Sequence, residues 1–258
     1  MEEYYNYAIR FELLYEELKA HCDVENVVDE LCATRFYTDI RMKQTLLEMG
    51  IIHVDYFDKK TYNLTMEELE EFGLLSKSGN FLLEGGYIVP IRDIEGYILA
   101  LVGWFPGRPT ASKYITSRSK YFSKKTSLFN IDNAVKIGQF KFVFVVEGVF
   151  DCIAMRSIGL PCVSIQGSEM SNIKRIILKM FSKIVPIPDN DDIGKGEFVK
   201  WAVEGNVTYV ELKGCIKIGD KLQVIKDTDD LIKYVDGIDE IMMEIMKSNE
   251  KLEKIEIS

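Results

Sequence analysis

The sequence lacks the cysteine patterns of disulfide scaffolds and zinc ribbons. Its five cysteines are scattered and odd in number, and none forms a Cys-x-x-Cys pair. His21, Cys22 and Cys32 come nearest to a zinc-ligand set, but a fourth ligand is missing. We therefore expect no bound zinc, and we expect Cys152 and Cys162 to be core residues.

Long apolar runs are missing as well. No segment reaches the length of a membrane-spanning helix, and the acidic start Met1-Glu2-Glu3 does not resemble a signal peptide. The chain has 258 residues, 47% of them hydrophobic, which is enough for a large core divided among two or three subdomains. These features predict a cytoplasmic protein.

What the sequence does contain is three short carboxylate clusters. They are Glu147-Gly148-Val149-Phe150-Asp151, Asp189-Asn190-Asp191-Asp192 and Asp227-Thr228-Asp229-Asp230. The first two directly follow apolar runs typical of buried strands, so a chance surface position explains them poorly. Neighbouring carboxylates repel one another unless cations or protons neutralise them. Hard oxygen ligands at this density suit Mg²⁺ or Mn²⁺, which organise phosphoryl transfer.

The region around the first two clusters alternates strands with helices. Strands are predicted at 142–146, 162–165, 184–187 and 207–212, and helices at 151–158, 171–181 and 197–203. Ser171 can cap the second helix, whose Ile173, Ile176, Ile177 and Met180 share one apolar face. This order implies a mostly parallel sheet with right-handed crossovers, and sites in such sheets form at the carboxyl ends of strands.

The third cluster allows two interpretations. Asp227 could cap a helix from Asp229 to Val235, with Asp229 and Asp230 favouring the helix dipole. The same residues could equally be metal ligands, and the local pattern does not decide between these roles. Asp192 is expected to be a neighbour of the site rather than a ligand.

The first two clusters together resemble the Toprim domain. Glu147-Gly-x-x-Asp151 after one buried strand, then Asp189-x-Asp191-x-x-Gly194 after another, is similar to the pattern shared by bacterial primases, type IA and type II topoisomerases, OLD-type nucleases and recombination-mediator proteins. Asn190 replaces the small residue of many members, and Asn tolerates turn geometry. The resemblance favours the ligand role for the third cluster, because Lys226-Asp227-Thr228-Asp229-Asp230 looks like the Lys-Asp-Pro-Asp-Glu segment of primases. It implies two or more Mg²⁺ or Mn²⁺ ions on catalytic Glu147, Asp189 and Asp191, supported by Asp151, Asp227 and Asp229.

The preceding segment narrows the resemblance. Tyr87–Asp93 and Tyr97–Gly103 read as a β-hairpin around Gly96. With Lys113-Tyr114-Ile115-Thr116-Ser117 and Phe122-Ser123-Lys124 downstream, the order is similar to that of the catalytic core of DnaG-type bacterial primases. The resemblance covers roughly 67–235, whereas topoisomerases and OLD-type nucleases share only the Toprim part.

Positive charge is concentrated in one stretch, although the chain has a formal net charge of −9. Residues 105–141 hold eight basic side chains and one acid, interleaved with aromatic residues, which suits a groove that binds phosphates and stacks bases. A solubilising surface loop is the plain alternative for any one of these lysines. The resemblance implies contacts with single-stranded template or nucleotide for Arg92, Lys113 and Lys124. Arg118, Lys120 and Lys125 could be simple phosphate contacts.

We predict an α/β fold with an α+β N-terminal part: a mixed, mostly parallel Toprim sheet flanked by helices, preceded by a smaller basic subdomain. The expected parts are a helical region 1–80, a basic subdomain 81–137, a Toprim domain 138–236 and a terminal helix 237–258. In the first part, Phe11, Leu13, Leu14 and Leu18 fit one amphipathic helix and 27–31 a second. A zinc-binding module and a helicase-binding domain, which bacterial primases usually carry, are not recognised, so we expect a compact, phage-like form.

The sequence therefore predicts a DNA primase that makes short RNA primers on single-stranded DNA from ribonucleoside triphosphates. Its expected partners include a replicative helicase and a separate zinc-bearing protein. Two alternatives stay open: a Toprim nuclease that uses the same carboxylates with water as nucleophile, and a non-catalytic DNA-binding adaptor of the replisome. The nuclease would not need Lys113 or Lys124, and loss of the acidic residues would have indicated the adaptor.

Overall fold

The structure is a computed structural model, and its contacts divide the chain into two units. One unit is Met1–Tyr37 with Lys43–Ser123, and the other is Thr38–Met42 with Lys124–Ser258. The predicted division into four parts stays a prediction. The residues that the structure describes are 2–58, 60–109, 113–190, 200–201, 215–218, 221–233 and 243, with the backbone alone at 215–218 and 221–223.

The first unit is built on a four-stranded antiparallel sheet in the order β1-β2-β3-β4. Its strands are β1 (Ile52–His53), β2 (Tyr87–Arg92), β3 (Ile98–Trp104) and β4 (Tyr114–Thr116). β2 and β3 form the predicted hairpin, with Val89 opposite Val102 and Gly96 at a positive φ of 98° in the turn. Nearly every residue of both strands is buried, as their continuous apolar sequence predicts.

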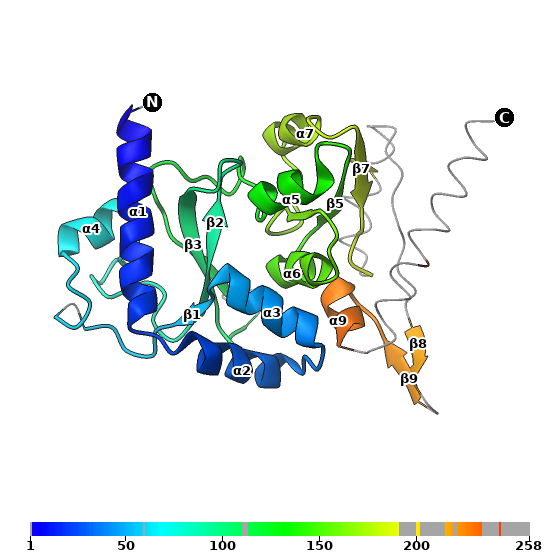
Figure 1. Ribbon diagram of the computed structural model, residues 1–258, viewed down its shortest axis with the longest axis horizontal. Coiled ribbons are helices and arrows are strands. Elements are labelled where there is room, and N and C mark those ends of the chain that lie inside the picture. The colour runs from blue at the N-terminus through cyan, green and yellow to red at the C-terminus, as the bar shows by residue number, and fades with distance from the viewer. Residues whose placement is uncertain are drawn as a thin grey trace. The chain divides into compact units, whose positions relative to one another are not determined.

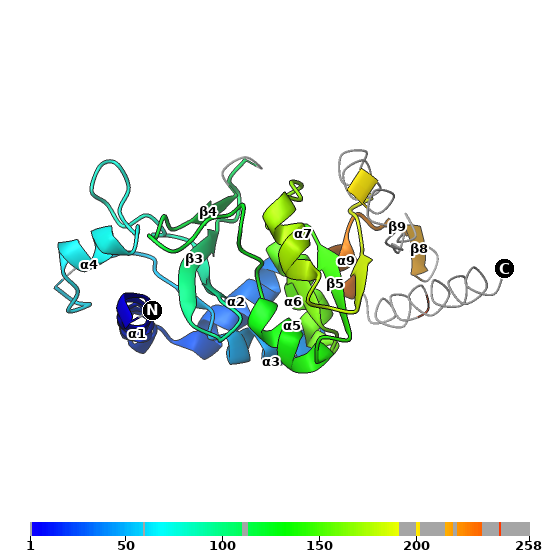
Figure 2. The same cartoon turned by 90° about the horizontal axis from the view of Figure 1, so that it is seen from above.

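Helix α1 (Glu2–Ala20) supplies the core that covers this sheet (Figures 1 and 2). Phe11, Leu14 and Leu18 are buried in one cluster with Ile88 and Leu101 from the strands. Leu13 was predicted to share that face, but its side chain is 66% exposed. It lies outside because the inward stripe of α1 follows the three- and four-residue spacing of Tyr7, Phe11, Leu14 and Leu18.

Three further helices precede the hairpin. They are α2 (Val24–Arg35), α3 (Ile40–Met49) and α4 (Met66–Glu71). The buried Val27, Val28 and Leu31 confirm the second amphipathic helix predicted from the sequence. Thr65 and Glu68 form a capping box that begins α4, which explains why this short helix starts there.

The second unit contains a three-stranded parallel sheet in the order β6-β5-β7. β5 (Phe142–Val146) lies between β6 (Cys162–Ser164) and β7 (Lys183–Pro186), so its residues are covered on both sides within the sheet. Helices α5 (Ile131–Gly138) and α6 (Val149–Ser157) pack against β5 and β6. The predicted alternation of strands and helices and the parallel sheet are confirmed, and Cys152 and Cys162 are core residues.

Helix α7 (Asn172–Leu178) begins at the predicted N-cap Ser171 but presents a different face to the core. Ile173, Ile176 and Met180 are 48%, 66% and 37% exposed, whereas Lys174 and Leu178 are buried. The expectation that the apolar stripe covers the core is therefore wrong for these three residues. Their place is taken by Leu178, the partly buried Ile177 and the aliphatic stem of Lys174.

The remaining described elements are a hairpin of β8 (Cys215–Ile218) and β9 (Lys221–Val224), followed by α9 (Thr228–Ile232). The hairpin was not predicted. Of the helix predicted at 197–203, Lys200 and Trp201 are described, and both are helical. The predicted strand 207–212, the terminal helix and residues Asp191, Asp192 and Gly194 lie outside the described residues. No helix in the described parts has the length and apolar character needed to cross a membrane.

Candidate metal centre and phosphate-binding residues

Glu147 is fixed at the carboxyl end of the central strand. It follows the buried residues of β5 directly and is itself only 9% exposed. Its backbone carbonyl accepts hydrogen bonds from the Ser164 hydroxyl at 2.7 Å and from the Gly167 N–H at 3.0 Å. The segment after β6 thus holds the main chain of Glu147, so the carboxylate is positioned at the edge where sites form in parallel sheets.

Gly148 explains the spacing between Glu147 and Asp151. A Cβ at this position would lie 2.1 Å from Asp151 Oδ2, far inside van der Waals contact. Gly148 is the N-cap residue of α6, and the Asp151 carboxylate folds back over it at the helix start, where the dipole favours negative charge. The Glu-Gly-x-x-Asp pattern therefore needs its glycine for space rather than for an unusual φ.

Asp151 links α6 to α9. Its Oδ1 accepts hydrogen bonds from the Asp229 backbone N–H at 3.0 Å and from the Thr228 hydroxyl at 3.2 Å. Burial, followed by repulsion from the charges of Asp189 and Asp229, raises the pKa of Asp151 to about 7, although these hydrogen bonds oppose the shift. The structure therefore brings together residues from all three predicted clusters.

In the third cluster the structure confirms the capping role of Asp227, and the role of metal ligand stays a prediction that the geometry allows. Asp227 is the N-cap of α9 and accepts from the Asp230 N–H at 2.8 Å. One carboxylate oxygen from each of Asp227, Asp229 and Asp230 also lies within 4.8 Å of the others, close enough to share a cation. Burial, followed by repulsion from Asp151 and Asp229, raises the pKa of Asp227 to about 7. The cap interaction uses one oxygen of Asp227, so capping does not prevent coordination through the other.

Lysines offset part of this negative charge. Lys233 Nζ lies 2.7 Å from Asp230 Oδ1 and 3.4 Å from Asp229 Oδ2. Lys226 Nζ lies 3.5 Å from Asp189 Oδ2, just after β7. Sequence reasoning assigned neither lysine to the site, and it also left out Asp230. The adjoining Lys-Asp-x-Asp-Asp pattern was the available signal.

Asn190 ties the second cluster to the third. Its N–H donates to Lys226 O at 2.6 Å, and its side-chain Nδ2 donates to Ile225 O at 3.0 Å. The Asn that departs from the Toprim pattern therefore has a structural role here, because it anchors Asp189 beside the segment that leads into α9. This role was not predicted, since its partners lie far along the chain.

The donor set fits a divalent metal. All side chains in it offer carboxylate oxygens, the ligands that Mg²⁺ and Mn²⁺ prefer. The pKa values of Asp151 and Asp227 are raised first by burial and then by repulsion from neighbouring carboxylates. A bound dication would relieve this repulsion directly.

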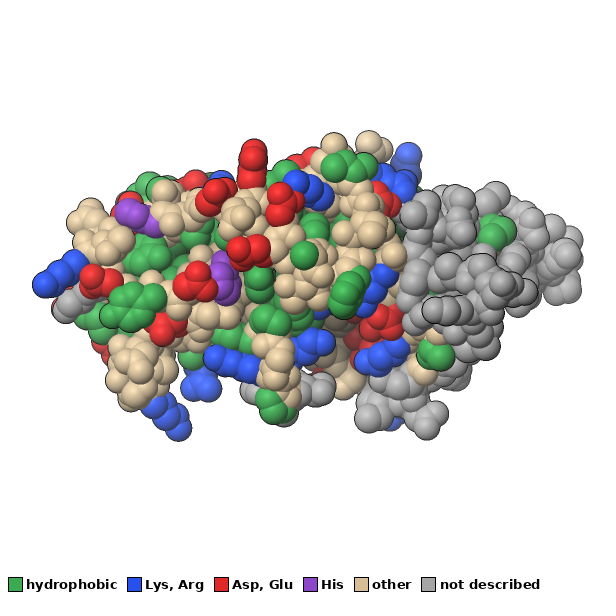
Figure 3. Space-filling view, turned by 90° about the horizontal axis from the view of Figure 1, so that it is seen from below, with side chains coloured by type: hydrophobic (Ala, Val, Ile, Leu, Met, Phe, Trp, Pro, Cys, Tyr) green, Lys and Arg blue, Asp and Glu red, His purple; other side chains and the backbone are tan. Residues whose placement is uncertain are grey.

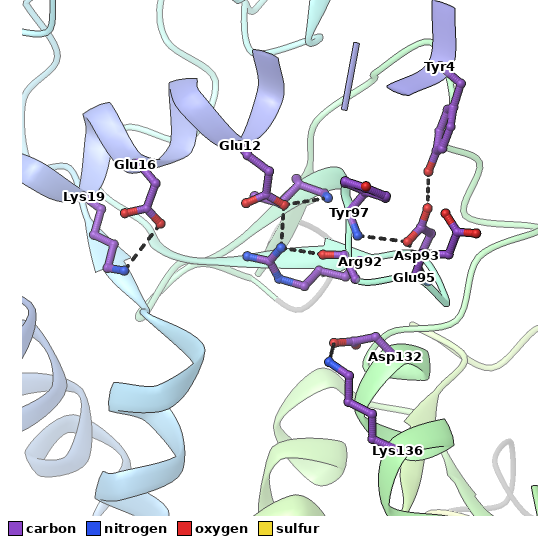
Figure 4. A network of polar contacts seen from close by, with 12 residues as sticks. Tyr4, Glu12, Glu16, Lys19, Arg92, Asp93, Glu95, Tyr97, Asp132 and Lys136 are labelled. Atoms are coloured by element: carbon purple, nitrogen blue, oxygen red, sulfur yellow. Dashed lines mark hydrogen bonds and ion pairs between the residues drawn. The ribbon is translucent and has the colours of Figure 1, made fainter. Parts of the chain in front are cut away.

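The basic residues predicted to bind phosphates fall in both units. Arg92 at the end of β2 donates to Glu12 Oε1 of α1 at 2.5 Å and to Gly96 O at 2.6 Å (Figure 4). The Glu12 oxygen also accepts from the Ile98 N–H at 3.0 Å, so these contacts join α1 to the hairpin. Arg92 thus has structural partners of its own, and its assignment to phosphate stays a prediction.

Arg118 and Lys120 follow β4 and are exposed. The Arg118 N–H donates to Gly73 O at 3.1 Å, and a Cβ on Gly73 would lie 2.3 Å from the Arg118 carbonyl carbon. Close backbone contact therefore sets the path of this segment. Lys120 pairs with the exposed Glu3 at 2.5 Å. Lys113 is half-buried beside β4.

In the second unit, Lys124 Nζ lies 3.6 Å from the position that a Cβ on Gly167 would occupy. Lys125 Nζ lies 4.0 Å from Oε1 of Glu169, which belongs to the same segment as Gly167. On the face drawn in Figure 3, described acidic and basic side chains are interspersed, and no large basic patch is seen among them. Lys124 and Lys125 are thus brought to the segment that follows β6, whose Gly167 is bonded to Glu147.

Comparison with known proteins points to one kind of enzyme. No protein-family model matches the chain. The DNA primase of Thermotoga maritima is 36% identical over 139 residues, which cover 51% of this chain and 24% of that protein. The DNA primase of Clostridium acetobutylicum is 25% identical over 232 residues, or 72% of this chain and 38% of that protein. The chain therefore spans well under half the length of these relatives.

Solved structures show the same likeness in fold. A DnaG catalytic core superimposes with a TM-score of 0.70 at 17% identity, covering 93% of this chain and 79% of that one. A DnaG primase catalytic domain bound to single-stranded DNA gives a TM-score of 0.69 at 16% identity, covering 93% and 80%. This chain thus has the fold of the DnaG primase catalytic core and, over 51% of its length, sequence similarity to a bacterial DNA primase.

Proposed function

We propose that this chain acts as the catalytic core of a DNA primase, which joins ribonucleotides into short primers along a single-stranded DNA template. The observation that carries the proposal is the convergence of Asp151, Asp189, Asp227 and Asp229 from separate elements at the carboxyl edge of the parallel sheet. The similarity to two bacterial DNA primases in sequence and to the DnaG catalytic core in fold supports the same reaction.

Divalent ions would be held by carboxylates alone. When bound, Mg²⁺ or Mn²⁺ lowers the pKa of an attacking hydroxyl and neutralises charge on a triphosphate. Within the described chain, Glu147 supplies a rigid ligand at the end of β5, and α9 supplies further carboxylates at its first turn. The residues proposed as ligands are Glu147, Asp151, Asp189, Asp191, Asp227 and Asp229.

Basic side chains would bind the template and the nucleotide. Lys124 and Lys125 adjoin the segment that is bonded to Glu147, so we assign them to the phosphates nearest the carboxylates. Lys113, Arg118 and Lys120 would contact the sugar-phosphate backbone of the template, which carries one charge per nucleotide. Arg92 would have to exchange its Glu12 partner for a phosphate to take part. A replicative helicase and a separate zinc-bearing protein are proposed as partners.

Single-residue variants test the assignment. We expect Asp189→Ala to abolish labelled primer synthesis while leaving the melting temperature unchanged or higher, because one repelling carboxylate is gone. Lys124→Ala should weaken the use of nucleotide without changing metal binding. Retention of full synthesis by Asp189→Ala would refute the site. Shortening of the template without synthesis would instead support the nuclease alternative.

A further inference from the structure

Helix α7 turns a lysine inward and apolar residues outward. Lys174 is 2% exposed, although Ile173 and Ile176 on the same helix are largely in solvent. Burial of an ammonium group is unfavourable unless it is paired, and lysine is among the residues least often buried. Packing of the aliphatic stem favours this orientation, but it does not offset burial of the ammonium group, which needs a further contact.

The contacts of Lys174 satisfy only part of its ammonium group. Nζ donates to the backbone carbonyl of Ile165 at 2.5 Å, which leaves two of its three donor hydrogens. Within the described chain Lys174 forms no ion pair, and Glu169 is the one acid recorded as acting on it electrostatically. Burial, followed by the positive charge of Lys124, lowers the pKa of Lys174 to about 8, although the negative charge of Glu169 opposes the shift.

Lys124 is a second cation next to the segment that follows β6. Lys124 Nζ is 3.6 Å from the position of a Cβ on Gly167, and its side chain has no hydrogen bond or ion pair among the described residues. Lys124 is exposed, whereas Lys174 lies beneath the surface. The two ammonium groups repel each other, and among the described residues neither forms an ion pair, although Glu169 offsets part of the repulsion at Lys174. Such an arrangement stabilises a bound anion, because one anion relieves both charges.

The segment next to both lysines has an unusual backbone and an unused acceptor. Gln166 adopts a left-handed φ of 60°, which is unfavourable for a residue other than glycine or asparagine. Its side chain is 7% exposed, and its Oε1 has no hydrogen-bond partner within the described chain. Gly167 next to it donates to Glu147 O at 3.0 Å, so the segment lies directly beside a proposed metal ligand.

We propose that Lys124 and the buried Lys174, which both lie next to the segment that follows β6, form the subsite for the triphosphate of the incoming ribonucleotide. Lys124 contacts the phosphates, and Lys174 is a positioning residue that adds charge from beneath and holds the segment through Ile165 O. A triphosphate fits better than template DNA, because its charge is compact and must meet metal-binding carboxylates at the same place. The inference rests on the proposed function and assigns Lys174 a role within it.

The test is equilibrium binding of ATP, inorganic tripolyphosphate and a single-stranded oligonucleotide to the full chain with Mg²⁺. Loss of one favourable charge interaction of about 1 kcal/mol corresponds to a roughly fivefold loss of affinity. We expect Lys174→Gln to weaken the binding of ATP and of tripolyphosphate by about this factor and to leave the affinity for the oligonucleotide unchanged. The matched control is Lys179→Gln, which removes an exposed charge at the end of the same helix.

A second variant separates charge from structure. Lys174→Met removes the charge and the hydrogen bond, whereas Lys174→Gln can keep a donor near Ile165 O. Equal loss of tripolyphosphate affinity in both variants supports the role of the charge. Preserved tripolyphosphate affinity in Lys174→Gln overturns the proposal and leaves Lys174 a purely structural residue. An equal loss in the Lys179→Gln control also overturns it, because the effect is then one of overall charge.

Other outcomes are equally distinct. Weaker oligonucleotide binding with normal tripolyphosphate binding would overturn the assignment in favour of a template contact. If the Lys174 variants do not fold, Lys124→Gln provides the same comparison at an exposed position, and unchanged tripolyphosphate affinity there overturns the subsite. Because binding is measured without turnover, the subsite can stand even if the chain makes no primers, and it can fail while synthesis is observed.

Discussion

Replacing Asp151 by asparagine should stabilise the metal-free protein. Asparagine keeps the Oδ1 acceptor for the Asp229 N–H and the Thr228 hydroxyl and has nearly the same size, so the packing beside Gly148 is preserved. The variant removes a buried negative charge that lies among other carboxylates. Its main effect is therefore to remove the cost of burying and crowding this charge, while the contacts are kept.

The size of the effect follows from the raised pKa. The ordinary pKa of 3.8 becomes about 7 in the folded protein. A pKa that differs by one between the folded and unfolded states corresponds to about 1.4 kcal/mol, so ionised Asp151 costs the fold up to roughly 4 kcal/mol above pH 7. The folded state binds more protons than the unfolded state between these pKa values, so stability falls as pH rises from about 4 to about 7.

The assay is thermal unfolding in EDTA at pH 5.5 and pH 8. We expect the unmutated protein to melt at a lower temperature at pH 8, and we expect Asp151→Asn to reduce this difference and to melt higher at pH 8. Glu169→Gln, which removes an exposed carboxylate in the same unit, is the control and should change little. Mg²⁺ should raise the melting temperature of the unmutated protein at pH 8. A variant that is less stable than the unmutated protein at pH 8 would refute the reasoning.

Four further substitutions have defined expectations. Gly148→Ala should displace the Asp151 carboxylate, because the new Cβ would lie 2.1 Å from its Oδ2, and should destabilise the fold by about 2 kcal/mol while weakening Mg²⁺ binding in calorimetry. Gly73→Ala should lower the free energy of unfolding by about 2–4 kcal/mol in denaturant titrations, because it combines a φ of 65° with a backbone clash. Gly79 has a φ of 79° with open space around it, so Gly79→Ala should lower the free energy of unfolding by only about 1 kcal/mol. An equal loss of stability in the Gly73 and Gly79 variants would contradict the clash. Arg92→Ala should destabilise the fold by about 1–3 kcal/mol through its lost contacts with α1 and the hairpin turn, whereas an unchanged melting temperature would indicate a phosphate contact alone.

The sheet of the second unit was predictable because its signals are local. A continuous apolar run such as Phe142–Val146 identifies a strand covered on both faces, and an acid directly after it marks the carboxyl edge. The Ser171 cap was readable for the same reason, since a cap depends on residues a few positions away. The proximity of the first two acidic clusters followed from the parallel order of the strands, whereas the third was placed with them only by the resemblance to primases.

The orientation of α7 was not predictable from periodicity. The apolar face of its sequence centres on Ile173 and Ile176, but the helix buries Lys174 through a contact with Ile165 O that no sequence pattern encodes. The roles of Arg92 and Asn190 depend likewise on partners distant in sequence, Glu12 and Lys226. Local patterns thus identified which charged residues adjoin strands and helix starts, and tertiary contacts determine the partner of each.

The most direct test of the account is template-directed ribonucleotide incorporation. The protein would be incubated with Mg²⁺ or Mn²⁺, labelled ribonucleotides and single-stranded DNA templates of defined sequence, with Glu147→Gln as the inactive control. The account predicts short labelled products that contain only nucleotides complementary to the template and that are absent with the variant. Products independent of template sequence, or equal products from Glu147→Gln, would contradict it.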